Sequence, residues 1–435
     1  MQEIKTFKSG LRLVVENVPN SESVSFDLLV KVGSENEDDA TRGISHFVEH
    51  MLFKSTKNYS NNSLMKAFNK IGGYIDAYTS IDRTVYSIKC IPDHLKKGVE
   101  LLSEMFFNHK FDETELETER NVILEEIQMN KDSSGRISSE NLISAFFAHT
   151  PIEHPVIGYE KTVKCITKNQ LHYYVSKHYK PENVILSFAG DITMADAMTL
   201  AEQYFQSHFK EIGLPSHEQK LKKKIVPKSS FIKCVKSTNA QSQIRIAIPT
   251  YNVYDENIDA MKILNVAFGN GMGSKLFTRI REELGLVYSI SSSLNTYKDG
   301  GYLSINFSTS HKNVETAVLE IKKLIEEVKH NGINEEEFEN AKTAIITAHK
   351  FANEKNGFVS NNNANTLAIF DRTYTKHERI DRINKVQLAH VNELAKDLFS
   401  SKNIIISYVG KETDKDLIVL FNEGHAPEEQ TEIVV

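Results

Sequence analysis

Two histidines four residues apart, with a glutamate directly before the second, have the types and spacing to bind a metal ion. They are His46, Glu49 and His50, in the apolar stretch GISHFVEHMLFKST. On a helix, residues i and i+4 share a face, so both imidazoles can reach one ion. Glu49 can point into the same site without binding the ion, which suits a general base that takes a proton from metal-activated water. The alternative is two helix histidines satisfied by hydrogen bonds, with a solvated glutamate.

A catalytic zinc site needs a third protein ligand and keeps a fourth position open. Two candidates lie in ETERNVILEEIQM, where Glu119 and Glu126 are seven residues apart. Seven residues are two helical turns, so both carboxylates lie on one face of a predicted helix. One of them can bind the ion while the other orients that ligand or polarises the water. Acidic pairs of this kind are also common on solvated helix faces.

The chain resembles the inverted-motif (H-x-x-E-H) zinc metallopeptidases, the family of pitrilysin, insulin-degrading enzyme and mitochondrial processing peptidase, and in particular its small bacterial members. Glu126 lies 126 − 50 = 76 positions beyond His50, where the family has its third ligand. The family's supporting glutamate precedes that ligand by the same spacing as Glu119 precedes Glu126. The resemblance therefore implies His46, His50 and Glu126 as ligands of one Zn²⁺ ion per chain. It implies Glu49 as the general base and Glu119 as the supporting residue.

Strands and helices must position the candidate site residues. The sequence predicts both kinds of element, but they do not alternate regularly along the chain. Alternating or apolar runs predict strands in FDLLVKV, TVYSIKCI and NVILSFAG, and two more strands flank a turn at Ser9 and Gly10. Amphipathic runs predict helices from Leu95 and from Val314. Because there is no βαβ cadence, the sequence favours the α+β class. The family resemblance implies mixed or antiparallel sheets covered by helices.

The chain carries the same domain twice. SVSFDLLV from Ser23 resembles SQIRIAIP from Ser242, and TVYSIKC from Thr84 resembles YLSINFS from Tyr302. VILSFAG resembles IIISYVG, which follows it by 404 − 184 = 220 positions. A polar stretch with two of the nine prolines separates the copies. The sequence therefore predicts an N-terminal zinc-binding catalytic domain at 1–208, a linker at 209–230 and a homologous domain without zinc at 231–435.

The second copy lacks H-x-x-E-H and carries the glycine-rich segment FGNGMGSKLF. Gly-Ser-Lys at 273–275 is in the wrong order for a phosphate-binding G-K-[ST] loop, so a nucleotide site is not predicted. Arg281 and Tyr288 follow, seven residues apart. The same metallopeptidase family carries such a pair in its catalytically silent half. The resemblance implies that Arg281 holds the substrate backbone and that Tyr288 helps to stabilise the oxyanion. A structural arginine and a core tyrosine are the alternative.

The segment IGGYIDAYTS, residues 71–80, resembles the family's edge strand, to which an extended substrate adds by main-chain hydrogen bonds. The resemblance implies substrate-binding positions at Gly73, Asp76, Ala77 and Thr79. The family usually has asparagine where this chain has Asp76, and glycine where it has Ser55. The carboxylate at position 76 leads to the hypothesis that substrate preference near the scissile bond shifts towards basic residues.

Composition limits the class of protein. The chain has 435 residues, 40% hydrophobic and 25% charged, as in soluble globular proteins. Its net charge of −6 argues against nucleic acid or an anionic membrane as a partner, and no apolar run approaches the roughly 20 residues that span a bilayer. Three distant cysteines without C-x-x-C spacing argue against a disulfide framework. Because the N-terminus lacks the pattern of a secretory signal, we expect a cytoplasmic bacterial protein.

We therefore expect a zinc-dependent metalloendopeptidase, a hydrolase that cleaves peptides or unfolded precursor segments. In the family, four such domains enclose a chamber, and the arginine and tyrosine face the zinc of the other half-molecule. Because this chain has two domains and both sets of residues, the resemblance implies a homodimer with composite sites. Three alternatives remain. They are a catalytically silent structural relative, one subunit of a heterodimeric processing peptidase, and a non-peptidase zinc lyase, which would need a cysteine ligand.

Overall fold

The computed structural model describes residues 2–210, 227, 231–237, 239–411 and 416–422. They belong to two compact units. Unit 1 comprises Met1–Gln128, His154–Glu218 and Lys350–Lys376, and unit 2 comprises Met129–Glu153, Gln219–His349 and His377–Val435. The predicted linker lies outside the described residues, except for Phe209, Lys210 and Pro227.

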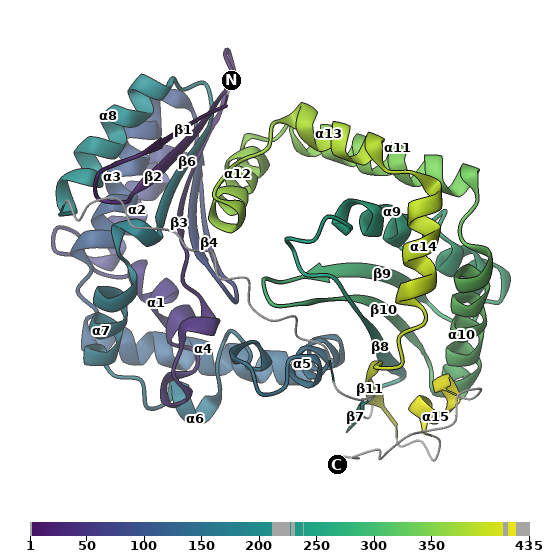
Figure 1. Ribbon diagram of the computed structural model, residues 1–435. Coiled ribbons are helices and arrows are strands. Elements are labelled where there is room, and N and C mark those ends of the chain that lie inside the picture. The colour runs from purple at the N-terminus through teal and green to yellow at the C-terminus, as the bar shows by residue number, and fades with distance from the viewer. Residues whose placement is uncertain (1, 211–226, 228–230, 238, 412–415, 423–435) are drawn as a thin grey trace. The chain divides into compact units, whose positions relative to one another are not determined.

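A six-stranded sheet forms the middle of unit 1, in the order β1-β2-β6-β3-β5-β4 (Figure 1). Neighbouring strands are antiparallel, except that β2 and β6 are parallel. The strands are β1 (Gln2–Thr6), β2 (Arg12–Asn17), β3 (Val24–Val30), β4 (Tyr74–Thr79), β5 (Thr84–Cys90) and β6 (Val184–Gly190). The predicted turn at Ser9 and Gly10 and the three predicted strands, now β3, β5 and β6, are confirmed.

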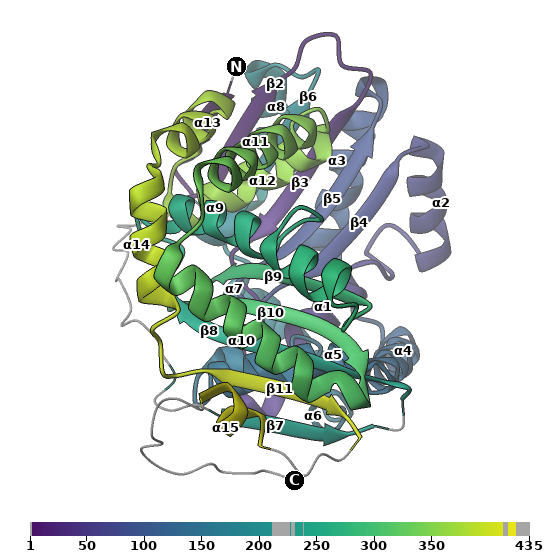
Figure 2. The ribbon, with the colours of Figure 1, turned by 90° about the vertical axis from the view of Figure 1, so that its right-hand side faces the viewer.

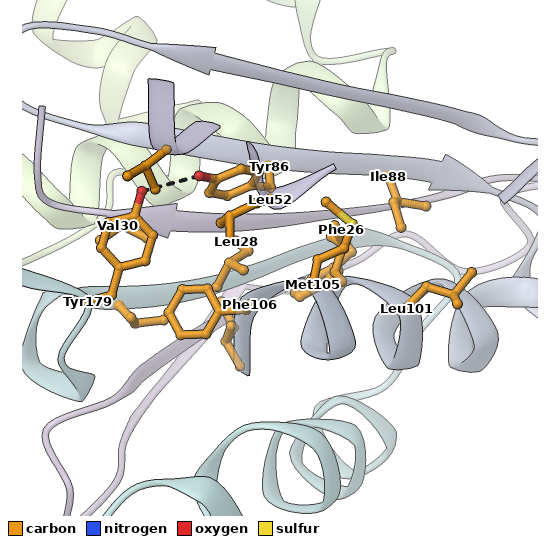
Figure 3. Packing of buried hydrophobic residues seen from close by; sticks show 14 of the residues in the cluster. Phe26, Leu28, Val30, Leu52, Tyr86, Ile88, Leu101, Met105, Phe106 and Tyr179 are labelled. Carbon is orange, nitrogen blue, oxygen red and sulfur yellow. Dashed lines mark hydrogen bonds between the residues drawn. The ribbon is translucent and has the colours of Figure 1, made fainter. Parts of the chain in front are cut away.

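One face of this sheet builds the main core of unit 1. Alternate residues of β3 point to it and pack against side chains of β5 and α3 (Figure 3). Within this core, Tyr86 and Tyr179 share a hydrogen bond of 3.2 Å between their hydroxyl groups. The helices of the unit on this side are α1 (Ile44–Leu52), α2 (Asn61–Ile71), α3 (Pro92–Asn108), α4 (Glu113–Asp132), α6 (Glu160–Val163), α7 (Lys168–His178) and α8 (Met194–Tyr204).

The other face of the same sheet is covered by α12 (Asn356–Phe370) (Figure 1). This helix packs against β6, β3 and β2. Ala364 and Leu367 join a small buried cluster with one apolar side chain from each of four strands: Val14, Leu29, Val85 and Ile185. A helix from the C-terminal half of the sequence therefore completes the unit that carries the H-x-x-E-H motif.

Unit 2 repeats this arrangement with a five-stranded sheet in the order β7-β11-β8-β10-β9 (Figure 2). Only β11 and β7 are parallel in this sheet, at the place that β6 and β2 occupy in unit 1. The strands are β7 (Phe231–Lys236), β8 (Gln241–Thr250), β9 (Ser289–Thr296), β10 (Gly301–Ser310) and β11 (Ile405–Gly410). The repeated sequence segments form the pairs β3 and β8, β5 and β10, and β6 and β11, so the predicted duplication is confirmed.

The sheet of unit 2 has α10 on one face and α5 on the other (Figures 1 and 2). α5 packs against β11 and β8, and the ring of its Phe146 lies 4.8 Å from that of Tyr302. The helices are α5 (Ser134–Phe146), α9 (Ile258–Phe268), α10 (Val314–Asn331), α11 (Glu335–Ala352), α13 (Lys376–Lys385), α14 (Leu388–Leu398) and α15 (Leu417–Asn422). No helix in the described parts of the chain is long and apolar enough to cross a membrane.

Each sheet is thus covered on its second face by a helix from the other half of the sequence. The compact units consequently differ from the predicted halves 1–208 and 231–435, because α12 belongs to unit 1 and α5 to unit 2. Hydrophobic periodicity indicates which face of a helix is buried, but it does not indicate which sheet buries that face.

Candidate metal centre

The helix α1 carries the H-x-x-E-H motif, as the sequence predicts. It follows Gly43, whose φ of 97° lies in the left-handed region that favours glycine. One side of the helix is anchored in the core of unit 1 by Ile44, Phe47, Val48, Met51 and Leu52. The histidines lie away from this anchored side, and their side chains remain 13% (His46) and 21% (His50) exposed.

The structure brings the three predicted ligands together. One ligand atom from each of His46, His50 and Glu126 lies within 4.8 Å of the others. Oε2 of Glu126 is 3.8 Å from Nε2 of His46 and 3.9 Å from Nε2 of His50. Two donors that each bind zinc at about 2.0–2.1 Å can be at most about 4.2 Å apart. The two distances from Glu126 lie within this limit, and the two-histidine, one-carboxylate donor set is one that zinc prefers.

The second nitrogen of His50 is held by Glu119. Nδ1 of His50 lies 2.9 Å from Oε1 of Glu119, and Lys54 forms an ion pair with the same carboxylate. Burial alone would raise the pKa of Glu119, but the hydrogen bonds and charges of His50 and Lys54 outweigh burial and lower it. An ionised Glu119 accepts the proton of Nδ1, which leaves Nε2 of His50 free to bind a metal.

Glu49 is almost buried, with 8% of its surface exposed. The hydroxyl of Thr79 donates a 2.5 Å hydrogen bond to its Oε2. Burial raises the pKa of Glu49, Thr79 and His50 oppose that rise, and the charges of Glu126 and Asp76 add to it. A carboxylate with a raised pKa holds a proton more tightly, which suits a group that must accept one.

The predicted substrate strand is β4, at the end of the six-stranded sheet. Its one partner in the described sheet is β5, so its outer edge can accept a further strand. The strand starts at Tyr74, directly after Gly73, where a Cβ atom would lie only 2.2 Å from the carbonyl oxygen of Lys89. Asp76 is exposed and Ala77 is half-buried. Thr79 ends the strand with its hydroxyl on Glu49.

Arg281 and Tyr288 lie in unit 2, whereas the metal cluster lies in unit 1. Arg281 belongs to the π-helical segment Phe277–Glu283, and its guanidinium carbon is 4.6 Å from the centre of the Phe277 ring. Tyr288 precedes β9 directly and is 75% exposed, so it is not a core tyrosine. Their predicted contact with substrate at the zinc stays a prediction.

Comparisons with known proteins agree with this geometry. The family model described as insulinase, peptidase family M16, matches residues 12–160, and the model described as the M16 inactive domain matches residues 166–345. The chain belongs to peptidase family M16. A Bacillus subtilis protein named an uncharacterized zinc protease is 32% identical over 401 residues, which cover 91% of this chain and 95% of that protein. A Rickettsia felis protein of the same description is 32% identical over 398 residues, covering 92% and 95%.

Two solved structures share the M16 fold of this chain. A structure described as the peptidase M16 inactive domain from Pseudomonas fluorescens has a TM-score of 0.86 at 17% identity, covering 95% of this chain and 99% of that chain. A protease from Helicobacter pylori has a TM-score of 0.85 at 22% identity, covering 94% and 99%. The predicted fold class, two tandem α+β domains with helix-covered sheets, is confirmed.

Two contacts of this M16 site were not predicted. Lys54 is four residues beyond His50, so the helical spacing that pairs the histidines could also have placed Lys54 near Glu119. The hydrogen bond from Thr79 to Glu49 joins residues 30 positions apart. Nothing in the local pattern of either segment indicates that contact.

Proposed function

We propose that the chain is a zinc-dependent endopeptidase that cleaves peptides or unfolded segments of proteins. The observation that carries this proposal is the grouping of two imidazoles and one carboxylate beside the anchored carboxylate of Glu49. Family membership and relatives named zinc proteases support it. A silent structural relative would have no need for a general base beside an intact set of ligands.

In the proposed mechanism His46, His50 and Glu126 hold the zinc ion. The chemistry that bound zinc supplies is polarisation of the scissile carbonyl and a water with a pKa of about 7. Thr79 binds Oε2 of Glu49, so Oε1 is the oxygen that takes the proton of the attacking water. Glu49 then gives this proton to the leaving amine. Glu119 keeps His50 in the tautomer that binds through Nε2.

The substrate in this proposal is an extended peptide. It would pair with the outer edge of β4 through main-chain hydrogen bonds, close to Glu49 because Thr79 ends that strand. Arg281 and Tyr288 would come from the partner chain of a homodimer that encloses the substrate in a chamber. We place this enzyme in the cytoplasm, a reducing compartment consistent with its three free cysteines.

The proposed activity can be tested on a mixture of unstructured peptides, with mass spectrometry of the products. We compare wild type, Glu49→Gln and Glu113→Gln, an exposed glutamate at the start of α4, each with and without a chelator. Cuts made by wild type and Glu113→Gln, lost in Glu49→Gln and with chelator, and restored by zinc, support the proposal. A folded, zinc-loaded wild type that cuts nothing would instead indicate a silent relative or a missing unlike subunit.

The composite site needs its own experiment. A Glu49→Gln chain keeps its Tyr288, and a Tyr288→Phe chain keeps its Glu49. Mixing the two variants should restore activity above that of either alone, because half of the sites in a mixed dimer have both groups intact. No recovery, although labelled subunits have exchanged, contradicts the composite site.

A further inference from the structure

The helix that carries the metal motif has no capping side chain of its own. Asp, Asn, Ser or Thr at the residue before a helix normally accepts a hydrogen bond from the free N–H groups of the first turn. Gly43 holds that position in α1. A Cβ atom on Gly43 would lie 2.5 Å from the carbonyl oxygen of Ile157, and its φ is left-handed. The position therefore excludes every capping side chain.

Glu37 supplies the missing cap from six residues earlier in the chain. Its Oε2 accepts the N–H of Gly43 at 2.8 Å, and its Oε1 accepts the N–H of Ser45, also at 2.8 Å. The side chain is buried, with 6% of the residue exposed. Burial of an ionised carboxylate is unfavourable unless hydrogen bonds and opposite charge compensate it. The positive N-terminus of the helix and nearby Arg42 favour the ionised form, but burial is the larger effect and raises the pKa of Glu37 to about 7.

Further contacts fix the same turn. The hydroxyl groups of Ser45 and Tyr174 share a hydrogen bond of 2.7 Å, which joins α1 to α7. The hydroxyl of Thr162 donates to the carbonyl oxygen of Arg42 at 2.6 Å, just before the helix starts. The first turn of α1 is thus held from several sides, and Glu37 accepts two of the N–H groups at its start.

The position of this turn decides the geometry of the metal cluster. His46 follows Ser45 directly, and Glu49 and His50 lie about one turn further along a helix of only nine residues. A rotation or shift of the first turn therefore moves the two imidazoles relative to Glu126, which lies on a different helix. We propose that Glu37 is a positioning residue of the metal centre, whose buried carboxylate fixes the rotation of α1 and thereby the donor geometry. This inference rests on the proposed zinc peptidase function.

A matched control distinguishes positioning from general stabilisation. Asp27 is a second buried carboxylate of unit 1, 2% exposed, and it accepts a hydrogen bond from Ser87 on the sheet face that α12 covers. It makes no contact with α1 among the described interactions. Glu37→Gln and Asp27→Asn each replace one buried carboxyl group with an amide, so both variants should change thermal stability. Only the change at Glu37 should alter the metal centre.

The experiment compares full-length wild type, Glu37→Gln, Glu37→Asp and Asp27→Asn. For each we measure the zinc Kd by competition with a chelator, the Tm of the metal-free protein, and kcat and KM on one unstructured peptide. In Glu37→Gln we expect zinc affinity to fall about tenfold or more and kcat to fall with it, while KM changes little. Glu37→Asp keeps the charge but cannot reach both N–H groups, so it should lie between wild type and Glu37→Gln. Asp27→Asn should keep the zinc affinity of wild type.

The outcomes separate this inference from the proposed function. A wild type that binds no zinc and cuts no peptide would contradict both the proposed function and the role of Glu37. A wild type that binds and cuts, with Glu37→Gln within twofold of it in zinc Kd and kcat at a changed Tm, would overturn only the role of Glu37. If Glu37→Gln does not fold, the zinc Kd and kcat of Glu37→Asp are compared with those of wild type instead, by the same twofold criterion. If Asp27→Asn lost as much zinc affinity as Glu37→Gln, the role of Glu37 would also be overturned. The loss of affinity would then follow from changed stability and not from the position of α1.

Discussion

At the scale of single residues, the carboxylate of Glu49 depends on one hydroxyl. Thr79→Val keeps the shape of the side chain and removes the donor of the 2.5 Å hydrogen bond. Burial already raises the pKa of Glu49, and loss of this bond raises it further because the bond favours the charged form. We expect kcat/KM to fall about tenfold, which corresponds to the loss of roughly 1.5 kcal/mol, and its acid limb to move to higher pH.

The measurement for Thr79 is a pH profile of kcat/KM, with Thr79→Ser as the control that keeps a hydroxyl. Zinc affinity should stay within about twofold of wild type in both variants, because Thr79 contacts the base and not a ligand. An unshifted acid limb in Thr79→Val would show that the hydroxyl does not control the protonation of Glu49.

Asp27 gives a prediction about stability and pH. Burial raises its pKa from 3.8 to about 6, although the polar side chains of Ser360, Ser87 and Asn361 favour the charged form. The folded protein therefore binds a proton that the unfolded chain has already lost between these two pH values. The stabilising effect is complete below pH 3.8 and is lost as the pH rises through about 6.

Asn at this position is neutral at every pH, so the comparison of wild type with Asp27→Asn isolates the titration. A shift of about two pKa units corresponds to roughly 3 kcal/mol. We expect the free energy of unfolding of Asp27→Asn to improve relative to wild type by about that amount between pH 4 and 6.5, and to change little above it. Denaturant unfolding of the metal-free proteins measures the difference, and a difference that is constant with pH would contradict the assigned pKa.

At the scale of elements, α1 and α4 must stay aligned, because the first carries two ligands and the second carries Glu126. Ser55, just beyond α1, donates its N–H at 3.0 Å and its hydroxyl at 2.6 Å to the two oxygens of Glu115 on α4. Ser55→Ala removes this hydroxyl bond and also the acceptor of the Asn61 N–H, which lies 3.1 Å from the hydroxyl oxygen. We expect a loss of about 1–2 kcal/mol in unfolding free energy and a smaller change in zinc affinity, because Glu119 still holds His50.

Ser176→Ala is the matched control for Ser55, since among the described residues this exposed hydroxyl on α7 bonds only to the carbonyl oxygen of Tyr173 on its own helix. It should change the unfolding free energy by less than about 0.5 kcal/mol. If both variants unfold at the same denaturant concentration as wild type, the bond between Ser55 and Glu115 does not brace the two helices.

The helices α1 and α4 show which parts of the fold and of the site could be predicted from the sequence. The spacing of His46 and His50 predicts one ion on one helix face, and α1 presents them in that way. The two-turn spacing of Glu119 and Glu126 likewise places both on one face of α4. Glu37 could not be predicted, because its capping role depends on a chain reversal that brings it to Gly43. A local sequence pattern predicts contacts within one helix or strand. It does not predict contacts between elements that come together only when the chain folds.

At the scale of the whole molecule, the exchange of α5 and α12 makes each half of the sequence depend on the other. A fragment of residues 1–208 contains the strands of unit 1 but lacks α12. Four side chains that are completely buried in the unit would become exposed: Val14, Leu29, Val85 and Ile185. Each such side chain contributes about 1.5–3 kcal/mol when buried. The loss is comparable to the whole stability of a typical domain.

We therefore expect the fragment 1–208 to be insoluble, or soluble without a cooperative thermal transition. Co-expression with residues 231–435 should restore a soluble complex, since that half supplies α12. A second half with Ala364→Asp and Leu367→Asp should fail to restore it, because both substitutions place a charge against the apolar face of the sheet. Solubility, light scattering and thermal unfolding of the three preparations measure these outcomes. A monomeric fragment 1–208 that melts cooperatively within about 5 °C of the full chain would show that α12 is dispensable, and that the sequence halves are independent folding units.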